Sequence, residues 1–160
     1  MNIIYTPIGC IHSPYMKVED MPIQPTGAIN VRGKITLFDE YITATKDLEG
    51  FSHIYLIYHF HKVTDWLPLI TPFLDDQSHG LFSTRAPKRP NPIGLSVVKL
   101  LGIDKNTLLI ENVDILDGTP VLDIKPYVPA FDQPESARIG WLEGKAASVE
   151  NQTSDERFKN

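Results

Sequence analysis

Residues 29–37 read INVRGKITL, and this stretch predicts the class of the fold. Apolar and polar side chains alternate along it, with Ile29, Val31, Ile35 and Leu37 in one set and Asn30, Arg32, Lys34 and Thr36 in the other. Successive side chains of an extended chain point to opposite faces, so each set lies on one face. The alternation therefore predicts a half-buried β-strand.

Further strands are predicted downstream of this one. Residues 54–60 form a run of β-branched and aromatic residues, which predicts a more deeply buried strand. Residues 95–103 and 108–116 are apolar runs separated by Asp-Lys-Asn at 104–106, which is a hairpin signal. Residues 121–128 predict one more strand.

One short helix is predicted at residues 39–48, where Tyr41, Ala44 and Leu48 share a face. Thirteen prolines and ten glycines divide the chain into pieces that suit short strands better than long helices. There is no long alternation of strands and helices, which argues against a Rossmann fold. The sequence thus predicts an all-β, or mostly β, fold, for which a closed barrel would remove exposed strand edges.

The composition limits the classes of function. The chain has 160 residues, which fits one domain, and 42% of them are hydrophobic, enough for a core. Its net charge of −5 makes it a poor general binder of nucleic acid, so such a partner would need a local basic patch. No apolar run approaches the roughly 18 residues of a membrane span, and no signal peptide is expected. With one cysteine, an internal disulfide is excluded, which suits a reducing cytoplasm.

Residues 80–94 read GLFSTRAPKRPNPIG and combine rigidity with positive charge. Three prolines lie within six residues, at 87, 90 and 92, and they stiffen the segment. The acid-free stretch 77–103 carries +4 from Arg85, Lys88, Arg89 and Lys99, so the rest of the chain carries −9. This segment is either a phosphate or carboxylate site or a solvated surface loop.

Residues 114–127 read DILDGTPVLDIKPY and contain the turn signal Asp117-Gly118. A structural turn is the plainer interpretation. The same geometry would expose backbone N–H and C=O groups, which can bind an adenine edge or an amino-acid moiety.

His53, His59 and His61 have the same parity along a strand, which is also the spacing of metal ligands. No cysteine lies near them and no second cluster completes a site, so we predict no metal. His53 and His59 are predicted to be structural. Cys10 is predicted to be a small buried apolar residue rather than a nucleophile.

Three long motifs occur in order: DLEGFSHIYLIYHF, RPNPIGLS and DILDGTPVLDIKPY. Together with the opening IGCIHSPY and with MPIQP, they make the chain similar to the TsaA-like family, also called the TrmO family. The resemblance extends to about Asp132. It implies a small single-sheeted β-barrel with one or two short helices that binds S-adenosylmethionine and forms a homodimer. Characterised relatives methylate N6 of threonylcarbamoyladenosine in tRNA, at the base just after the anticodon.

The family's cofactor contacts are carried over only where the motifs match. The cofactor-binding residues that the resemblance implies are Pro22, Ile23, Gln24, His61, Lys62, Arg85, Leu95, Asp117, Gly118, Thr119 and Pro120. Lys62 stands where bacterial relatives are expected to have glutamine. Lys88 and Arg89 are the residues expected to contact tRNA phosphates.

The resemblance also divides the chain into a barrel domain at residues 1–133 and a polar extension at 134–160. Residues 143–160 are predicted to be a frayed helix or tail. No catalytic base is assigned, although His61 and Asp117 are candidates by chemistry. Two alternatives stay open: a non-catalytic module that binds S-adenosylmethionine, and a methyltransferase for a small molecule or another RNA.

Overall fold

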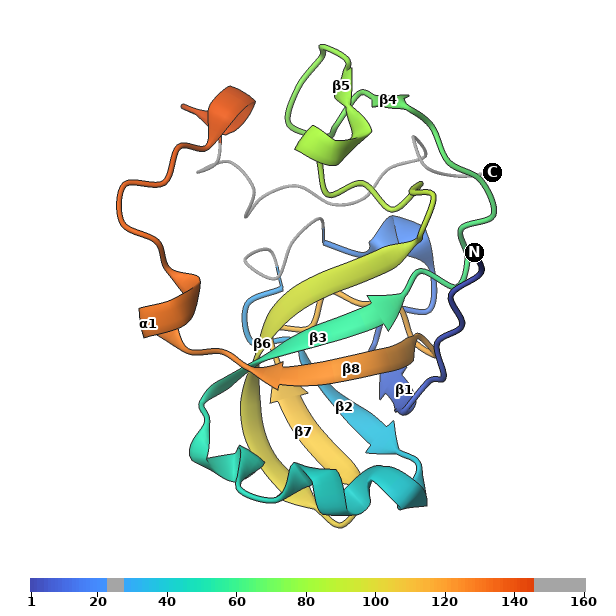
Figure 1. The fold of residues 1–160 in the computed structure, drawn as a ribbon, viewed down its shortest axis with the longest axis vertical. Helices are drawn as coiled ribbons and strands as arrows, with labels where there is room; N and C mark the ends of the chain where they lie inside the picture. The colour runs from blue at the N-terminus through green and yellow to red at the C-terminus, as the bar shows by residue number, and fades with distance from the viewer. Residues whose placement is uncertain (23–27, 146–160) are drawn as a thin grey trace.

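The computed structural model describes residues 1–22 and 28–145, and its centre is a closed antiparallel barrel (Figure 1). The strand order around the barrel is β1-β2-β7-β6-β3-β8. The six strands are β1 (Gly9–His12), β2 (Arg32–Leu37), β3 (His53–His59), β6 (Ile93–Asp104), β7 (Thr107–Glu111) and β8 (Pro120–Pro126). This architecture confirms the all-β fold and the single-sheeted barrel.

The first strand of the chain closes the barrel. Gly9 of β1 lies opposite Leu37 of β2 on one side and opposite Val121 of β8 on the other. The sequence did not predict β1, because four residues are too few to show an alternation. The hairpin predicted at residues 104–106 is confirmed, since β6 and β7 pair across it.

The core is filled by side chains of every barrel strand and of residues 113–115, which follow β7. The largest fully buried side chains are Ile11, Ile35, Ile54, Leu56, Val98, Leu108, Ile110, Val113, Ile115 and Val121. In β3, buried Ile54, Leu56 and Tyr58 alternate with half-buried neighbours. The prediction that this strand is more deeply buried than the one at residues 29–37 is confirmed, because no residue of β3 is exposed, whereas Arg32 and Lys34 of β2 are.

Several predicted boundaries also differ from the structure. β2 begins at Arg32, and Ile29 is 59% exposed because Asn30 adopts a left-handed turn with φ of 63°. β7 ends at Glu111, where Asn112 has φ of 65°. Residues 113–116 are buried without being a strand, so their apolar character reflects burial alone.

The helix predicted at residues 39–48 is instead two 3₁₀ helices, η3 (Asp39–Thr45) and η4 (Leu48–Gly50). Asp47 has φ of 65°, which breaks the segment before a second turn can continue the first. Leu48 packs against the barrel core. The segment thus covers the end of the barrel that is lowest in Figure 1.

A second layer lies beyond the opposite end of the barrel (Figure 1). It contains the hairpin of β4 (Leu69–Ile70) and β5 (His79–Gly80), followed by η5 (Leu81–Ser83). Ile70, Leu81 and Ala86 form a small separate core. The other helices of the described residues are η1 (Val18–Asp20), α1 (Pro129–Asp132) and η6 (Gly140–Leu142).

The tail predicted at residues 143–160 lies mostly outside the described residues, which end at Lys145. In the ranges 1–22 and 28–145, no helix has the length and apolar character that a membrane crossing requires.

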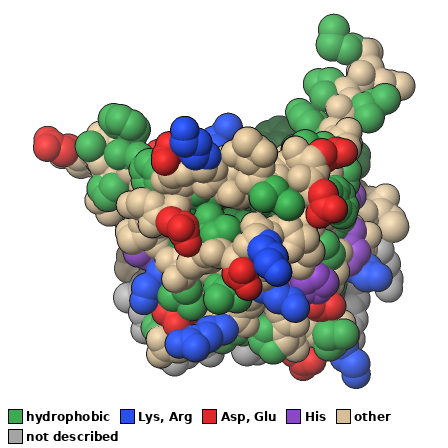
Figure 2. Space-filling view, turned by 90° about the horizontal axis from the view of Figure 1, so that it is seen from below, with side chains coloured by type: hydrophobic (Ala, Val, Ile, Leu, Met, Phe, Trp, Pro, Cys, Tyr) green, Lys and Arg blue, Asp and Glu red, His purple; other side chains and the backbone are tan. Residues whose placement is uncertain are grey.

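Figure 2 shows the face that carries η3 and η4, where Lys and Arg side chains are interspersed with Asp and Glu. That face is therefore not a basic surface of the kind that holds nucleic acid.

Candidate functional site

The DGTP turn, residues 117–120, is held against the first strand by backbone hydrogen bonds. Gly118 N donates to Ile11 O at 2.9 Å, and Ile11 N donates to Thr119 O at 2.9 Å. Gly118 has φ of 76°, a conformation that glycine adopts without steric cost. The turn is therefore part of the barrel end rather than a free loop.

Asp117 ties the turn to the segment that follows β1. Its carboxylate accepts a hydrogen bond from Ser13 N at 3.1 Å and lies 3.7 Å from His12 Nδ1. Its own N–H donates to Tyr15 O at 2.8 Å, and Ser13 Oγ donates to Ile115 O at 2.6 Å. The Asp117 side chain remains 29% exposed, so it is still available to a ligand.

His61 meets the DGTP turn although it is far from it in sequence. It follows β3, and its Nδ1 lies 3.3 Å from Oγ1 of the buried Thr119. Burial, reinforced by the positive charge of Lys62, lowers the pKa of His61 below its ordinary value. The imidazole is therefore neutral near pH 7 and can accept a proton or hydrogen-bond a ligand.

A chain of buried polar groups lies next to this turn. Ser96 Oγ donates to Asp114 Oδ1 at 2.8 Å, and the Tyr58 hydroxyl lies 3.1 Å from the same Oγ. Asp114 is 8% exposed, Tyr58 is 5% exposed and Ser96 is 3% exposed. Burial raises the pKa of Asp114 to about 6 and raises the pKa of Tyr58 as well. A carboxyl group that titrates near neutrality at such a place is typical of functional sites.

Arg85 connects this network to the charged loop. Its positive charge partly opposes the rise in the pKa of both Asp114 and Tyr58. The guanidinium therefore acts electrostatically on the buried network, although Arg85 itself is exposed. An exposed guanidinium next to a buried acid suits the binding of a carboxylate or phosphate from solvent.

Two basic side chains of the proline loop, residues 80–94, make contacts within the protein that stabilise the loop. Lys88 is buried, and its Nζ lies 3.4 Å from Asp65 Oδ1. Arg89 Nη1 donates to Thr84 O at 3.0 Å, to Ala86 O at 3.4 Å and to Leu81 O at 3.5 Å. The loop is thus an ordered platform that presents Arg85.

Comparisons with known proteins agree with this geometry. The sequence matches the family described as the tRNA-methyltransferase O N-terminal domain over residues 10–133. The chain belongs to the tRNA-methyltransferase O family. A relative from Pyrococcus abyssi, named a probable S-adenosyl-L-methionine-binding protein, is 52% identical over 158 residues, which is 99% of this chain and 86% of that protein.

Members of the tRNA-methyltransferase O family with more specific names are longer than this chain. The Escherichia coli tRNA (adenine(37)-N6)-methyltransferase is 34% identical over 151 residues, which is 88% of this chain and 64% of that protein. A crystal structure of TrmO from Pseudomonas aeruginosa has a TM-score of 0.74 and 40% identity, over 88% of this chain and 63% of the other. A further TrmO crystal structure has a TM-score of 0.76 and 42% sequence identity.

The structure brings together some of the residues that the family resemblance implies, and separates others. His61 meets Thr119 in the DGTP turn, and Asp117, Gly118 and Pro120 are part of the same turn. Leu95 is 50% exposed on β6 and Lys62 is exposed after β3, whereas Pro22 is buried. Ile23 and Gln24 lie outside the described residues. The binding roles of all these residues remain predictions.

Other predicted residues have structural surroundings. His53 Nδ1 lies 2.9 Å from Ser52 Oγ, and its ring packs edge-on against Tyr127. Burial, and then the charge of Asp117, raises the pKa of Cys10, which favours the unreactive thiol. Within the described residues there is no cluster of three or more His, Cys, Asp or Glu that could hold a metal.

Sequence patterns did not point to Asp114, Ser96 or Tyr58, and they assigned no role to His12. Asp114 offered one signal, since an acidic residue within the apolar run 108–116 is unusual unless it has a buried partner. Ser96 offered a weaker signal, because it is a polar residue on the face of β6 that also carries Val98 and Leu100.

Proposed function

We propose that this chain is an S-adenosylmethionine-dependent methyltransferase that modifies N6 of threonylcarbamoyladenosine next to the anticodon of tRNA. The observation that carries the proposal is the meeting of His61 with the DGTP turn at the end of a barrel of this family. The E. coli relative and a mouse relative, each 34% identical, bear the name tRNA (adenine(37)-N6)-methyltransferase. Both names support a tRNA substrate.

The residues at the site fit the chemistry of S-adenosylmethionine. The exposed Arg85 guanidinium suits the carboxylate of its amino-acid portion, and the partly exposed Asp117 carboxylate suits a cationic or hydroxyl group. The exposed Leu95 offers an apolar surface. S-adenosylmethionine would supply an activated methyl group on a sulfonium centre. The chain would supply position, which contributes up to ~7–11 kcal/mol when the reacting atoms are aligned.

His61 is the better of the two candidate bases. Its lowered pKa keeps the imidazole neutral at pH 7, whereas the Asp117 carboxylate already accepts a hydrogen bond from Ser13 N and lies beside His12. For His61 to accept a proton, Nδ1–H must donate to Thr119 Oγ1, which leaves Nε2 as the acceptor. The urea-like nitrogen of the substrate is a weak nucleophile, so removing its proton would favour methyl transfer.

The tRNA would bind to the acid-free stretch 77–103, because the rest of the chain has a net charge of −9. The flipped base would be bound by stacking and by hydrogen bonds to its edge.

We further propose that the chain forms a homodimer in which one proline loop completes the partner's site. Light scattering of an active protein tests this, and an active monomer would disprove it.

The proposal is tested by incubating the protein with labelled S-adenosylmethionine and total tRNA that lacks this methyl group, followed by nucleoside analysis. Labelled N6-methylated threonylcarbamoyladenosine is the expected product. Calorimetric binding of S-adenosylmethionine without turnover on tRNA would favour a non-catalytic binding module, as the name of the Pyrococcus relative would allow. Turnover of an extract that survives nuclease treatment would favour a small-molecule substrate.

A further inference from the structure

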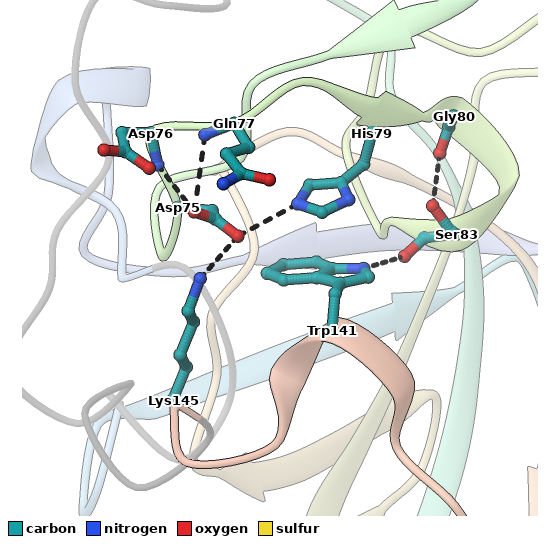
Figure 3. A network of polar contacts seen from close by, with 8 residues as sticks. All are labelled: Asp75, Asp76, Gln77, His79, Gly80, Ser83, Trp141 and Lys145. Carbon is teal, nitrogen blue, oxygen red and sulfur yellow. Dashed lines mark hydrogen bonds and ion pairs between the residues drawn. The ribbon is translucent and has the colours of Figure 1, made fainter.

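A polar network outside the barrel joins the end of the described chain to the proline loop (Figure 3). We define residues 140–145 as the C-terminal clasp. Trp141 Nε1 donates to Ser83 O at 2.8 Å. The Trp141 ring also stacks on His79, with ring centroids 4.4 Å apart and planes inclined by 20°. One side chain therefore contacts both β5 and η5.

The clasp has a second attachment through Asp75, in the loop between β4 and β5. The Asp75 side chain is 6% exposed, and its Oδ2 lies 3.0 Å from His79 Nε2. The same oxygen accepts a hydrogen bond from Lys145 Nζ. Hydrogen bonds from Lys145 and then His79 lower the pKa of Asp75 below its ordinary value, so the carboxylate is charged. Figure 3 shows Asp75 bonded both to Lys145 and to His79, whose ring lies over the Trp141 indole.

The attachment at Ser83 is two residues from Arg85, and the intervening chain is stiff. Thr84 N donates to Leu81 O at 3.0 Å, and Ala86 N donates to Thr84 Oγ1 at 3.3 Å. Leu81 and Ala86 are both buried in the small second core. A hold on Ser83 is therefore transmitted to the backbone of Arg85.

We propose that Trp141 is a positioning residue for the cofactor, acting through Ser83 to fix the place of Arg85. This inference rests on the proposed function, in which Arg85 binds S-adenosylmethionine. The clasp lies outside residues 10–133, which match the family domain, so it is an addition to the site that the family's motifs do not contain. The clasp thereby contributes to the site through the loop that it holds.

The first test compares wild type with Trp141→Phe, which keeps a ring but removes the indole N–H. The loss of this one N–H···O bond predicts S-adenosylmethionine affinity weaker by roughly three- to tenfold in calorimetry. The rate of methyl transfer at saturating cofactor should stay the same, because Trp141 does not touch the reacting atoms. Trp66→Phe is the matched control, as Trp66 is 52% exposed, and its affinity should equal that of wild type.

A double-variant cycle separates positioning from general stabilisation. If Trp141 acts through Arg85, Trp141→Phe in an Arg85→Ala background should cause no further loss of affinity. Lys145→Ala is an independent second variant, because it releases the Asp75 attachment while leaving the indole in place, and it should weaken cofactor binding in the same direction.

Equal affinities of wild type and both clasp variants would overturn the positioning role, as would losses that add to that of Arg85→Ala. Absence of S-adenosylmethionine binding by folded wild-type protein is a different result. It would reject the proposed function itself, and the positioning role with it.

Discussion

The DGTP turn and the proline loop both carry proposed cofactor contacts, yet they are held in place by different kinds of interaction. The turn is tied to β1 through backbone groups, such as Gly118 N to Ile11 O. The loop has backbone hydrogen bonds as well, such as Leu81 N to Pro68 O, but it also depends on side chains that reach backbone oxygens, such as Arg89 to Thr84 O and Trp141 to Ser83 O. Backbone pairing survives most substitutions, whereas a single substitution removes a side-chain hydrogen bond. Variants beneath the turn should therefore change stability, and variants in the loop should change binding.

The largest effect is expected for the buried acid beside the turn. The pKa of Asp114 is about 6 in the folded protein and roughly 3.9 in an unfolded chain. The folded state thus binds this proton more tightly, so its stabilising contribution is complete below pH ~4 and is lost as the pH rises through ~6. Between pH 4 and 7, the unfolding free energy of wild type should fall by about 2 kcal/mol relative to Asp114→Asn.

Urea unfolding at a series of pH values measures this difference. Asp123→Asn is the control, because the Asp123 side chain is 46% exposed and its profile should follow that of wild type. Parallel profiles for wild type and Asp114→Asn would show that the buried acid does not titrate as described.

The next effect concerns packing under the same end of the barrel. A Cβ at Gly94 would lie 2.2 Å from Cε2 of Tyr58, inside the ring's van der Waals boundary. Gly94→Ala should therefore lower the unfolding free energy by about 2 kcal/mol, as overpacking does. Gly102→Ala on the same strand is the control, since its Cβ would meet nothing within 4 Å. Equal denaturation midpoints for the two variants would contradict the packing described for Tyr58.

In the proline loop, Arg85→Ala should weaken S-adenosylmethionine binding by roughly tenfold, the loss expected for a charge-assisted contact. Its thermal midpoint should stay close to that of wild type, because the Arg85 side chain is exposed. Lys46→Ala, an exposed charge at the other end of the barrel, is the control. An unchanged cofactor affinity in calorimetry would remove Arg85 from the site.

The smallest effect is expected in the salt dependence of tRNA binding. Lys88→Ala with Arg89→Ala should flatten the slope by roughly 0.7 to 0.9 for each phosphate that is no longer neutralised. Arg89→Ala alone should account for most of the change, because Lys88 is buried against Asp65 and must leave that pair to reach a phosphate. A salt series of tRNA affinities for both single variants tests the division. An unchanged slope in the double variant would mean that the loop does not face RNA.

The barrel was largely predictable because long strands show their periodicity locally. Five of its strands fell within or close to predicted stretches, and boundaries failed where a left-handed residue such as Asn30 or Asn112 ended a strand early. β1 has four residues and β4 and β5 have two each, too few to display an alternation. Closure of the sheet depends on pairing between distant segments, which no local pattern contains.

The site was predicted only where motifs carried it. The buried network joins Asp114 to Ser96 across 18 residues, and Ser96 to Tyr58 across 38. These contacts depend on strand register, which no single stretch of sequence contains. The burial of Lys88 has the same origin, because its partner Asp65 belongs to another segment. Charge in a sequence shows how many cations a loop has, not how many face solvent.

Closure of the barrel between β1 and β8 also determines when the site can assemble during synthesis. The chain is synthesised from its N-terminus, so Gly9 can pair with Val121 and close the sheet only after residue 121 has been made. Contacts between residues so far apart in sequence form slowly, since the intervening chain loses entropy before they are made. The DGTP turn leads into β8, which begins at Pro120, so the turn reaches its partners in β1 only at that final pairing. A nascent chain released before residue 121 would therefore contain the proline loop but no site for it to complete.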